Sequence, residues 1–184
     1  SLIRCLITDG NYSAAPERWI AHATHWITEG VELLQIRERD LPPRELAELT
    51  RTLLRIPNPH GTKILVNDRA DIAIACNAHG VHLRDRSVAP AKFARPGFLI
   101  TVSCHDLEAA GQLGGADYVL LAPVFRPLSK TDRRPVLGTA AIQEFARRSP
   151  VPVLALGGVT NENDRSCIDA GAAGIAGITY FGRS

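Results

Sequence analysis

Short runs of apolar, mostly β-branched residues alternate with segments of helical periodicity, and the alternation occurs eight times along the chain. Several of the runs are apolar at nearly every position, which is typical of parallel strands covered on both faces. The expected strands are residues 2–8, 31–37, 63–67, 80–83, 99–103, 118–122, 153–156 and 174–178.

The intervening segments predict helices. Residues 42–55 place four leucines on one helical face, and residues 16–28 begin with a proline suited to a first helical turn. Asp106 is expected to cap a third helix, and Asn161 or Asn163 a later one.

Alternating strands and helices predict parallel strands joined by right-handed crossovers, and eight such units can close a barrel. The expected fold class is therefore α/β, with residues 1–184 forming a single (β/α)8 TIM barrel. Six residues follow the eighth expected strand, so its last helix is expected to be truncated or missing. The alternative is an open doubly wound sheet, but no Gly-x-Gly-x-x-Gly motif follows the first strand.

Composition narrows the class of protein. The chain is 45% hydrophobic and 22% charged, which is ordinary for a globular domain. A net charge of +2 without a long basic run argues against a nucleic-acid partner. No apolar stretch approaches the roughly 20 residues of a membrane span, and the first residues do not resemble a signal peptide. Four separated cysteines without a Cys-x-x-Cys pair suggest free thiols in the cytoplasm.

Polar residues gather immediately after the expected strands, where the loops of such a barrel build its site. In chain order they are Gln35, Arg37, Glu38, Arg39, Asn67, Asp68, Arg69, Arg84, Asp85, Arg86, Ser103, His105, Ser129, Lys130, Gly157, Gly158 and Thr179. Arginine and lysine suit phosphate oxygens, and a glycine pair lets backbone N–H groups approach a phosphate. Asp68 is a candidate Mg²⁺ ligand, because Mg²⁺ prefers carboxylate oxygens and water. These positions together predict an anion site.

Other interpretations of the same residues stay open. Arg37 and Arg39 flank Glu38, so the three side chains could form a surface ion-pair cluster. Asp68 could cap the helix expected to begin near Ala70. The glycine pair could serve any strand-to-helix turn, and single histidines after strands are more often core or hydrogen-bonding residues than bases.

Several motifs resemble those of one known superfamily in order and spacing. They are Gln35-Ile36-Arg37-Glu38-Arg39, Val66-Asn67-Asp68-Arg69, Gly80-Val81-His82-Leu83, Thr101-Val102-Ser103-Cys104-His105, Ala116-Asp117-Tyr118, Pro123-Val124-Phe125 with Ser129-Lys130, and Ala155-Leu156-Gly157-Gly158-Val159 with Asn163. From Gln35 to Gly177 the chain resembles the thiamine-phosphate synthase and thiazole tautomerase superfamily, which implies a TIM barrel.

The resemblance to the synthase implies a reaction in two steps. A pyrimidine pyrophosphate loses its pyrophosphate, and the ring nitrogen of a thiazole phosphate attacks the resulting carbocation. It also implies roles for individual residues: Gln35 contacts the pyrimidine; Arg37, Arg39, Asn67, Ser103 and Lys130 hold pyrophosphate; Asp68 binds Mg²⁺; Ser129 supplies a loop hydroxyl; and backbone at Gly158, Ile178 and Thr179 holds the thiazole phosphate.

The chain departs from this pattern at four positions. Arg39 stands where the synthase has lysine, and Ser87 where it has a second Mg²⁺ aspartate, with Asp85 as a nearby candidate substitute. Pro127 replaces a loop threonine, and Pro123 stands where some tautomerases carry a catalytic histidine.

Three functions follow as hypotheses. The first is a thiamine-phosphate synthase-like transferase, with Mg²⁺ as its cofactor. The second is a thiazole phosphate tautomerase, and the third is a non-catalytic binder of phosphorylated ligands. All three imply phosphorylated small molecules as partners, and the sequence leaves open whether the chain forms a homo-oligomer.

Overall fold

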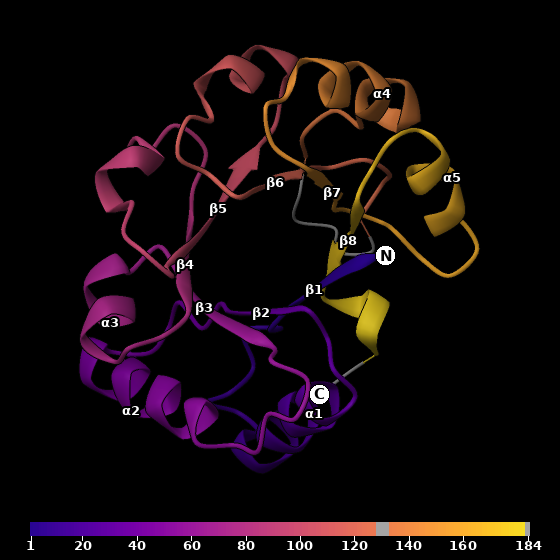
Figure 1. Cartoon of the computed structure of the whole chain (residues 1–184). Helices are drawn as coiled ribbons and strands as arrows, with labels where there is room; N and C mark the ends of the chain where they lie inside the picture. The colour runs from indigo at the N-terminus through magenta and orange to yellow at the C-terminus, as the bar shows by residue number, and fades with distance from the viewer. Residues whose placement is uncertain (128–132, 183–184) are drawn as a thin grey trace.

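The computed structural model describes residues 1–127 and 133–182, and it forms a closed barrel of eight parallel strands (Figure 1). The strands are β1 Ile3–Ile7, β2 Leu33–Ile36, β3 Lys63–Asn67, β4 Gly80–Leu83, β5 Leu99–Cys104, β6 Tyr118–Leu121, β7 Val153–Ala155 and β8 Gly174–Gly177. Each strand pairs with the next one along the chain, and β8 pairs with β1. The predicted TIM barrel is confirmed, with all eight strands within two residues of their expected bounds.

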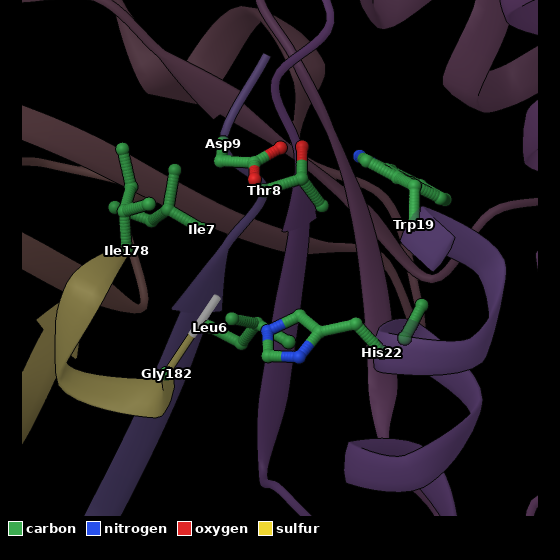
Figure 2. A pocket seen from close by; sticks show the side chains of 9 residues that line it. Leu6, Ile7, Thr8, Asp9, Trp19, His22, Ile178 and Gly182 are labelled. Atoms are coloured by element: carbon green, nitrogen blue, oxygen red, sulfur yellow. The ribbon is translucent and has the colours of Figure 1, made fainter. Parts of the chain in front are cut away.

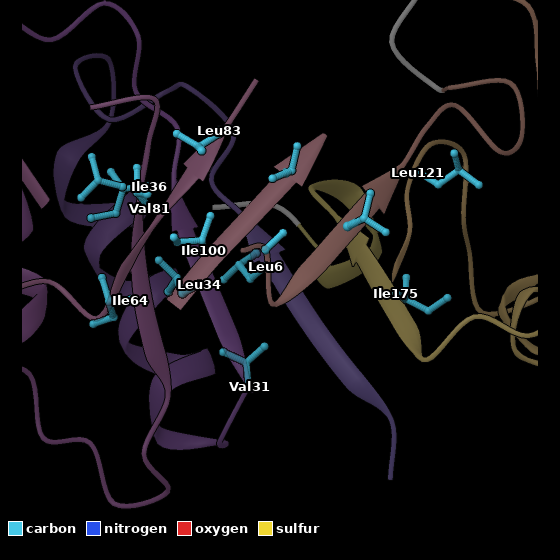
Figure 3. Close-up of a cluster of buried hydrophobic side chains, with 14 of the residues drawn as sticks. Leu6, Val31, Leu34, Ile36, Ile64, Val81, Leu83, Ile100, Leu121 and Ile175 are labelled. Carbon is cyan, nitrogen blue, oxygen red and sulfur yellow. The ribbon is translucent and has the colours of Figure 1, made fainter. Parts of the chain in front are cut away.

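Alternating side chains divide the core into two layers, because successive residues of a strand face opposite sides of the sheet. In β1, Leu6 packs between the barrel and its helices, while Cys5 and Ile7 face the barrel interior. Figure 3 shows the outer layer, in which Leu34 of β2 lies between Leu6 of β1 and Ile64 of β3. The inner layer consists of Cys5, Ile7, Leu33, Leu65, Leu120, Leu154 and Ala176.

Helices surround the strands, but their lengths differ (Figure 1). The α-helices are α1 Pro16–Thr28, α2 Pro43–Leu54, α3 Ala70–Ala75, α4 Gly138–Arg148 and α5 Asp164–Asp169. The 3₁₀ helices are η1 Pro90–Phe93, η2 Leu107–Gln112 and η3 Thr179–Phe181. The two strongest helical patterns are thus confirmed as α1 and α2. Asp106 caps as expected, accepting from the Ala109 N–H at 3.1 Å, although the helix is a 3₁₀ helix.

The barrel closes where β8 meets β1, with Gly174 opposite Ile3. A Cβ atom on Gly174 would overlap the carbonyl oxygen of Ile3, so only glycine allows the two strands this close. Beyond β8, the described residues form the 3₁₀ turn η3. The carbonyl of Phe181 accepts from Trp26 Nε1 at 3.1 Å, and the two rings pack edge to face.

A small enclosed cavity of about 10 Å³ lies between β1, α1 and the segment after β8 (Figure 2). Trp19 and His22 of α1 line one side, and Ile178 and Gly182 line the other. The buried Trp19 Nε1 has no hydrogen-bond partner there among the described residues. A cavity of this size holds about one water molecule, so it cannot bind a metabolite. Among the described helices, none has the length and apolar character of a membrane span.

Candidate active site

An open cavity of about 900 Å³ lies at the carboxyl ends of the strands. It begins where the inward positions change from apolar to polar, for example from Leu33 to Gln35 in β2 and from Leu65 to Asn67 in β3. Its polar and charged lining residues are Gln35, Arg37, Arg39, Asn67, His82, Arg84, Asp85, Ser103, His105, Arg133 and Arg134. Since inward positions recur every second residue, the strand period brings together the side chains at the strand ends. Arg133 and Arg134 come instead from the segment between β6 and α4.

Positive charge dominates this cavity: five of its lining residues are arginines, and Asp85 is the one acid among them in the described part of the chain. Arg37 is half-buried, and its guanidinium makes no hydrogen bond or ion pair with the described residues. Burial, and then the nearby charge of Arg39, lower the pKa of Arg37 from its ordinary value. A partly desolvated cation without a protein partner is suited to an anionic ligand.

The surface ion-pair interpretation of Glu38 is wrong, because this residue is buried with only 2% of its surface exposed. Its carboxylate accepts from the Thr8 hydroxyl at 2.7 Å and from the N–H groups of Gly10 and Tyr12 at 2.9 and 2.7 Å. The Thr8 hydroxyl oxygen in turn accepts from the Arg37 N–H at 2.8 Å. Glu38 therefore holds the loop after β1, and its charge is compensated by these donors rather than by an arginine.

Gln35 lies deep in the cavity with 1% of its surface exposed. Its Nε2 is buried and has no hydrogen-bond partner among the described residues. A buried amide donor normally finds an acceptor, so this group has the environment of a ligand contact. Its role toward the pyrimidine stays a prediction, as does that of Asn67, which also lines the cavity.

Ser103 is held by a buried histidine on the neighbouring strand. His82 Nε2 lies 2.8 Å from Ser103 Oγ, and His82 Nδ1 lies 2.7 Å from Thr101 Oγ1. Burial, and then the positive charge of Arg37, lower the pKa of His82 to about 3. The imidazole is therefore neutral at physiological pH, with one donor and one acceptor nitrogen. His82 is a hydrogen-bonding histidine, and it orients the Ser103 hydroxyl in the cavity wall.

This depressed pKa predicts acid sensitivity. Between pH 6.5 and 3 the unfolded chain binds a proton at residue 82 that the folded chain excludes. The free energy of unfolding should therefore fall as pH decreases, by about 1.4 kcal/mol per pH unit from this group. Urea unfolding of wild type and His82→Gln between pH 6 and 4 measures the difference in slope, which cancels contributions from other histidines. Equal slopes would contradict the assignment.

Asp68, the expected magnesium ligand, has a left-handed backbone, with φ of 63°. Its N–H donates to the carbonyl of His82 at 2.7 Å, and its Oδ2 lies 3.1 Å from Arg84 Nε. The helix-cap interpretation of Asp68 is wrong: the N-cap residue of α3 is Arg69, and no side chain caps that helix. Asp68 is thus directed toward the loop after β4.

The other two candidate metal positions lie in that same loop. Asp85 lines the cavity, and its Oδ2 lies 3.2 Å from Arg86 Nη1. The Ser87 hydroxyl donates to the carbonyl of Arg84 at 2.9 Å, and Ser87 lines a separate cavity of about 340 Å³. No cluster of three or more potential metal ligands occurs in residues 1–127 and 133–182. Both carboxylates face arginines, so these residues do not fit a magnesium ion as they stand, and Mg²⁺ binding stays a prediction.

The loop after β7 contains Gly157 and Gly158, with positive φ angles of 102° and 63°. A Cβ atom on Gly158 would overlap the carbonyl oxygen of Arg126. Asn163 Nδ2 donates to the Gly158 carbonyl at 3.0 Å, and Asn163 Oδ1 accepts from the Thr160 N–H at 2.8 Å. Asn163 occupies the N-cap position of α5, but its side chain makes hydrogen bonds to this loop and none that caps the helix. The Gly158 N–H donates to no described acceptor, as a phosphate-binding amide should.

Most of the predicted site residues share this one cavity, including Gly157 and Ile178 on the side of β7 and β8. Gly158 and Thr179 are the next residues in the sequence after Gly157 and Ile178, and neither of them lines the cavity. Ser129 and Lys130 lie outside the described residues. Arg84 and His105, which the sequence placed after their strands without an individual role, also line the cavity. Their position in the sequence was the available signal. Arg84 lies two residues after His82, and His105 lies two residues after Ser103, so both continue the series of inward-facing residues of their strands.

Comparison with known proteins gives the family. The sequence model of the thiamine monophosphate synthase family matches residues 4–181. The thiamine-phosphate synthase of Methanoculleus marisnigri is 40% identical over 155 residues, which are 82% of this chain and 74% of the relative. That of Roseiflexus castenholzii is 36% identical over 181 residues, or 95% of this chain and 78% of the relative. The solved structure of thiamine phosphate pyrophosphorylase from Pyrococcus furiosus superposes with a TM-score of 0.82 at 31% identity, covering 97% of this chain and 86% of that one. The chain belongs to the thiamine monophosphate synthase family.

Proposed function

We propose that this chain is a transferase that joins a pyrimidine pyrophosphate to a thiazole phosphate and releases pyrophosphate. The observation that carries the proposal is the arginine-lined cavity of about 900 Å³, which contains the buried Gln35 Nε2, a donor with no partner among the residues described. Cavities for small ligands usually measure about 300–1,000 Å³, so this one has room for two small substrates. The arginines of the cavity suit the pyrophosphate, and the Gly158 loop suits the second phosphate.

The reaction needs charge stabilisation more than proton transfer. The carbon–oxygen bond to pyrophosphate breaks, with its electron pair going to the leaving oxygen, and the thiazole nitrogen lone pair then forms the new carbon–nitrogen bond. Negative charge accumulates on the leaving group, where Arg37 and Arg39 stabilise it and the Ser103 hydroxyl donates a hydrogen bond. His82 remains neutral and holds Ser103.

Magnesium, when bound, would supply further positive charge to pyrophosphate. Asp68 is the ligand that the family resemblance implies, but its carboxylate is paired with Arg84, so no step of the proposed reaction is assigned to a metal. We place the enzyme in the cytoplasm, because its four cysteines are free and buried.

One observation favours the tautomerase as a second candidate. His105 lines the cavity beside Pro123, the position where some tautomerases carry a histidine. Its Nδ1 lies 2.9 Å from the carbonyl of Ala122. With a proton on Nδ1 donated to that carbonyl, Nε2 is left as a base, and it could exchange a proton with a bound thiazole.

The decisive assay mixes purified chain with both substrates and follows thiamine phosphate and pyrophosphate. We expect equal amounts of the two products, with no pyrophosphate release when the chain is omitted. Absence of both products, together with proton exchange on the thiazole, would replace the synthase by the tautomerase. Absence of both activities, with thiazole phosphate still bound, would leave the binder.

A further inference from the structure

The loop after β4 brings an arginine to the place where the family resemblance implies a metal. Arg84 continues the inward alternation of Gly80 and His82, so it lines the cavity. Its Nε lies 3.1 Å from Asp68 Oδ2. Asp68 is directed there by its own backbone, whose N–H donates to the carbonyl of His82. The carboxylate expected to hold Mg²⁺ therefore already holds a permanent cation.

The same loop lacks the second carboxylate. Ser87 stands in its place, with its hydroxyl bonded to the Arg84 carbonyl and its side chain in a different cavity. Compared with the implied metal site, this loop loses one negative charge at position 87 and presents a guanidinium at position 84. Asp85 does not restore the missing ligand, because it is paired with Arg86. The two changes act in one direction, since they weaken cation binding and strengthen direct binding of an anion.

We propose that the Arg84 guanidinium binds the pyrophosphate group directly and replaces magnesium there, so that pyrophosphate binds to this chain without a metal. This proposal rests on the proposed function. A guanidinium presents two parallel N–H donors that match two phosphate oxygens, and it stays charged at any physiological pH. Arg84 keeps 69% of its side chain exposed, so it can turn toward a ligand without disturbing the core. In the reaction it stabilises the same leaving pyrophosphate as Arg37.

The test is titration calorimetry with inorganic pyrophosphate in EDTA, which needs no turnover. Wild type should bind, and Arg84→Gln should bind about 10- to 100-fold more weakly, as expected for loss of one charge-assisted hydrogen-bonding group. The matched control is Arg44→Gln, because Arg44 lies on α2 outside the cavity lining, with its guanidinium 3.6 Å from Glu48. The control should bind like wild type. Thermal unfolding of all three should agree, since both arginines are largely on the surface.

Magnesium separates the two models further. In wild type, added Mg²⁺ should change the affinity less than about threefold, whereas in Arg84→Gln the released Asp68 should let Mg²⁺ recover part of the lost affinity. The proposal is overturned if wild type fails to bind pyrophosphate in EDTA, or if Arg84→Gln binds as well as wild type. Pyrophosphate binding that depends on Arg84, without condensation of the two substrates, would instead contradict the proposed function and leave the role of Arg84 intact.

Discussion

Arg37→Gln should lower kcat/KM for the condensation by about 100- to 1,000-fold, the usual effect of removing one donor to developing negative charge. Arg37 is the half-buried arginine of the cavity, its guanidinium has no partner among the described residues, and it lines the same cavity as Gln35. Arg44→Gln is the matched control, because Arg44 is 91% exposed on α2, paired with Glu48. Steady-state kinetics of both variants measure the effect, and a loss smaller than tenfold would remove Arg37 from the pyrophosphate site.

The same variant should fold at least as well as wild type. The partly desolvated guanidinium of Arg37 has no partner in the described part of the chain and is therefore costly, and burial already lowers its pKa. Replacing it by a neutral amide removes that cost, so the thermal midpoint should stay constant or rise. This separation of activity from stability is expected where a site holds groups for a ligand. A large fall in the midpoint would show that Arg37 is structural.

Gly174→Ala should destabilise the barrel by about 3 kcal/mol or more. The new Cβ atom would overlap the carbonyl oxygen of Ile3, which is backbone and cannot turn aside as a side chain would. The two strands would have to separate at the junction that closes the barrel. Urea denaturation measures the loss in free energy of unfolding. If Gly174→Ala does not accumulate in folded form, the protease concentration that cleaves half of each protein in cell extract ranks the variant against wild type.

Gly114→Ala serves as the control for this variant. Nothing lies within 4 Å of an added Cβ atom on Gly114, and its backbone is not left-handed. Its free energy of unfolding should stay within about 0.5 kcal/mol of wild type. A similar loss in both variants would mean that Gly174 is no tighter than an ordinary loop glycine.

The fold was largely predictable because its signals are local. Each strand is a short apolar run between polar loops, and the start of α1 is marked by Pro16. The lengths of the crossovers were less predictable: Asp106 caps as expected, yet its helix is a 3₁₀ helix. Whether a short segment completes α-helical turns depends on packing against the barrel, which a single sequence does not contain.

The candidate site was predictable in composition but not in its pairings. Parallel strands bring their carboxyl ends together, so the shared cavity followed from the order of the strands. The partner of each charged side chain depends on strand register and backbone angles. Glu38 accepts a hydrogen bond from the loop after β1, and Asp68, whose own backbone is left-handed, pairs with Arg84. Likewise, His82 reaches Ser103 because β4 and β5 pair His82 with Thr101. No local pattern encodes these contacts.

The strand order has a consequence for how the chain folds. Seven of the eight ladders join strands that are neighbours along the chain, so each can form by closing a single crossover. The β1–β8 ladder joins opposite ends of the chain, as does the Trp26–Phe181 hydrogen bond, whose partners lie 155 positions apart. An open, curved sheet can therefore assemble progressively, and the β1–β8 ladder should form last because it joins the strands that lie farthest apart in the sequence. The cavity at the strand ends gains its wall from β8 only with that step, so binding competence should appear last in refolding.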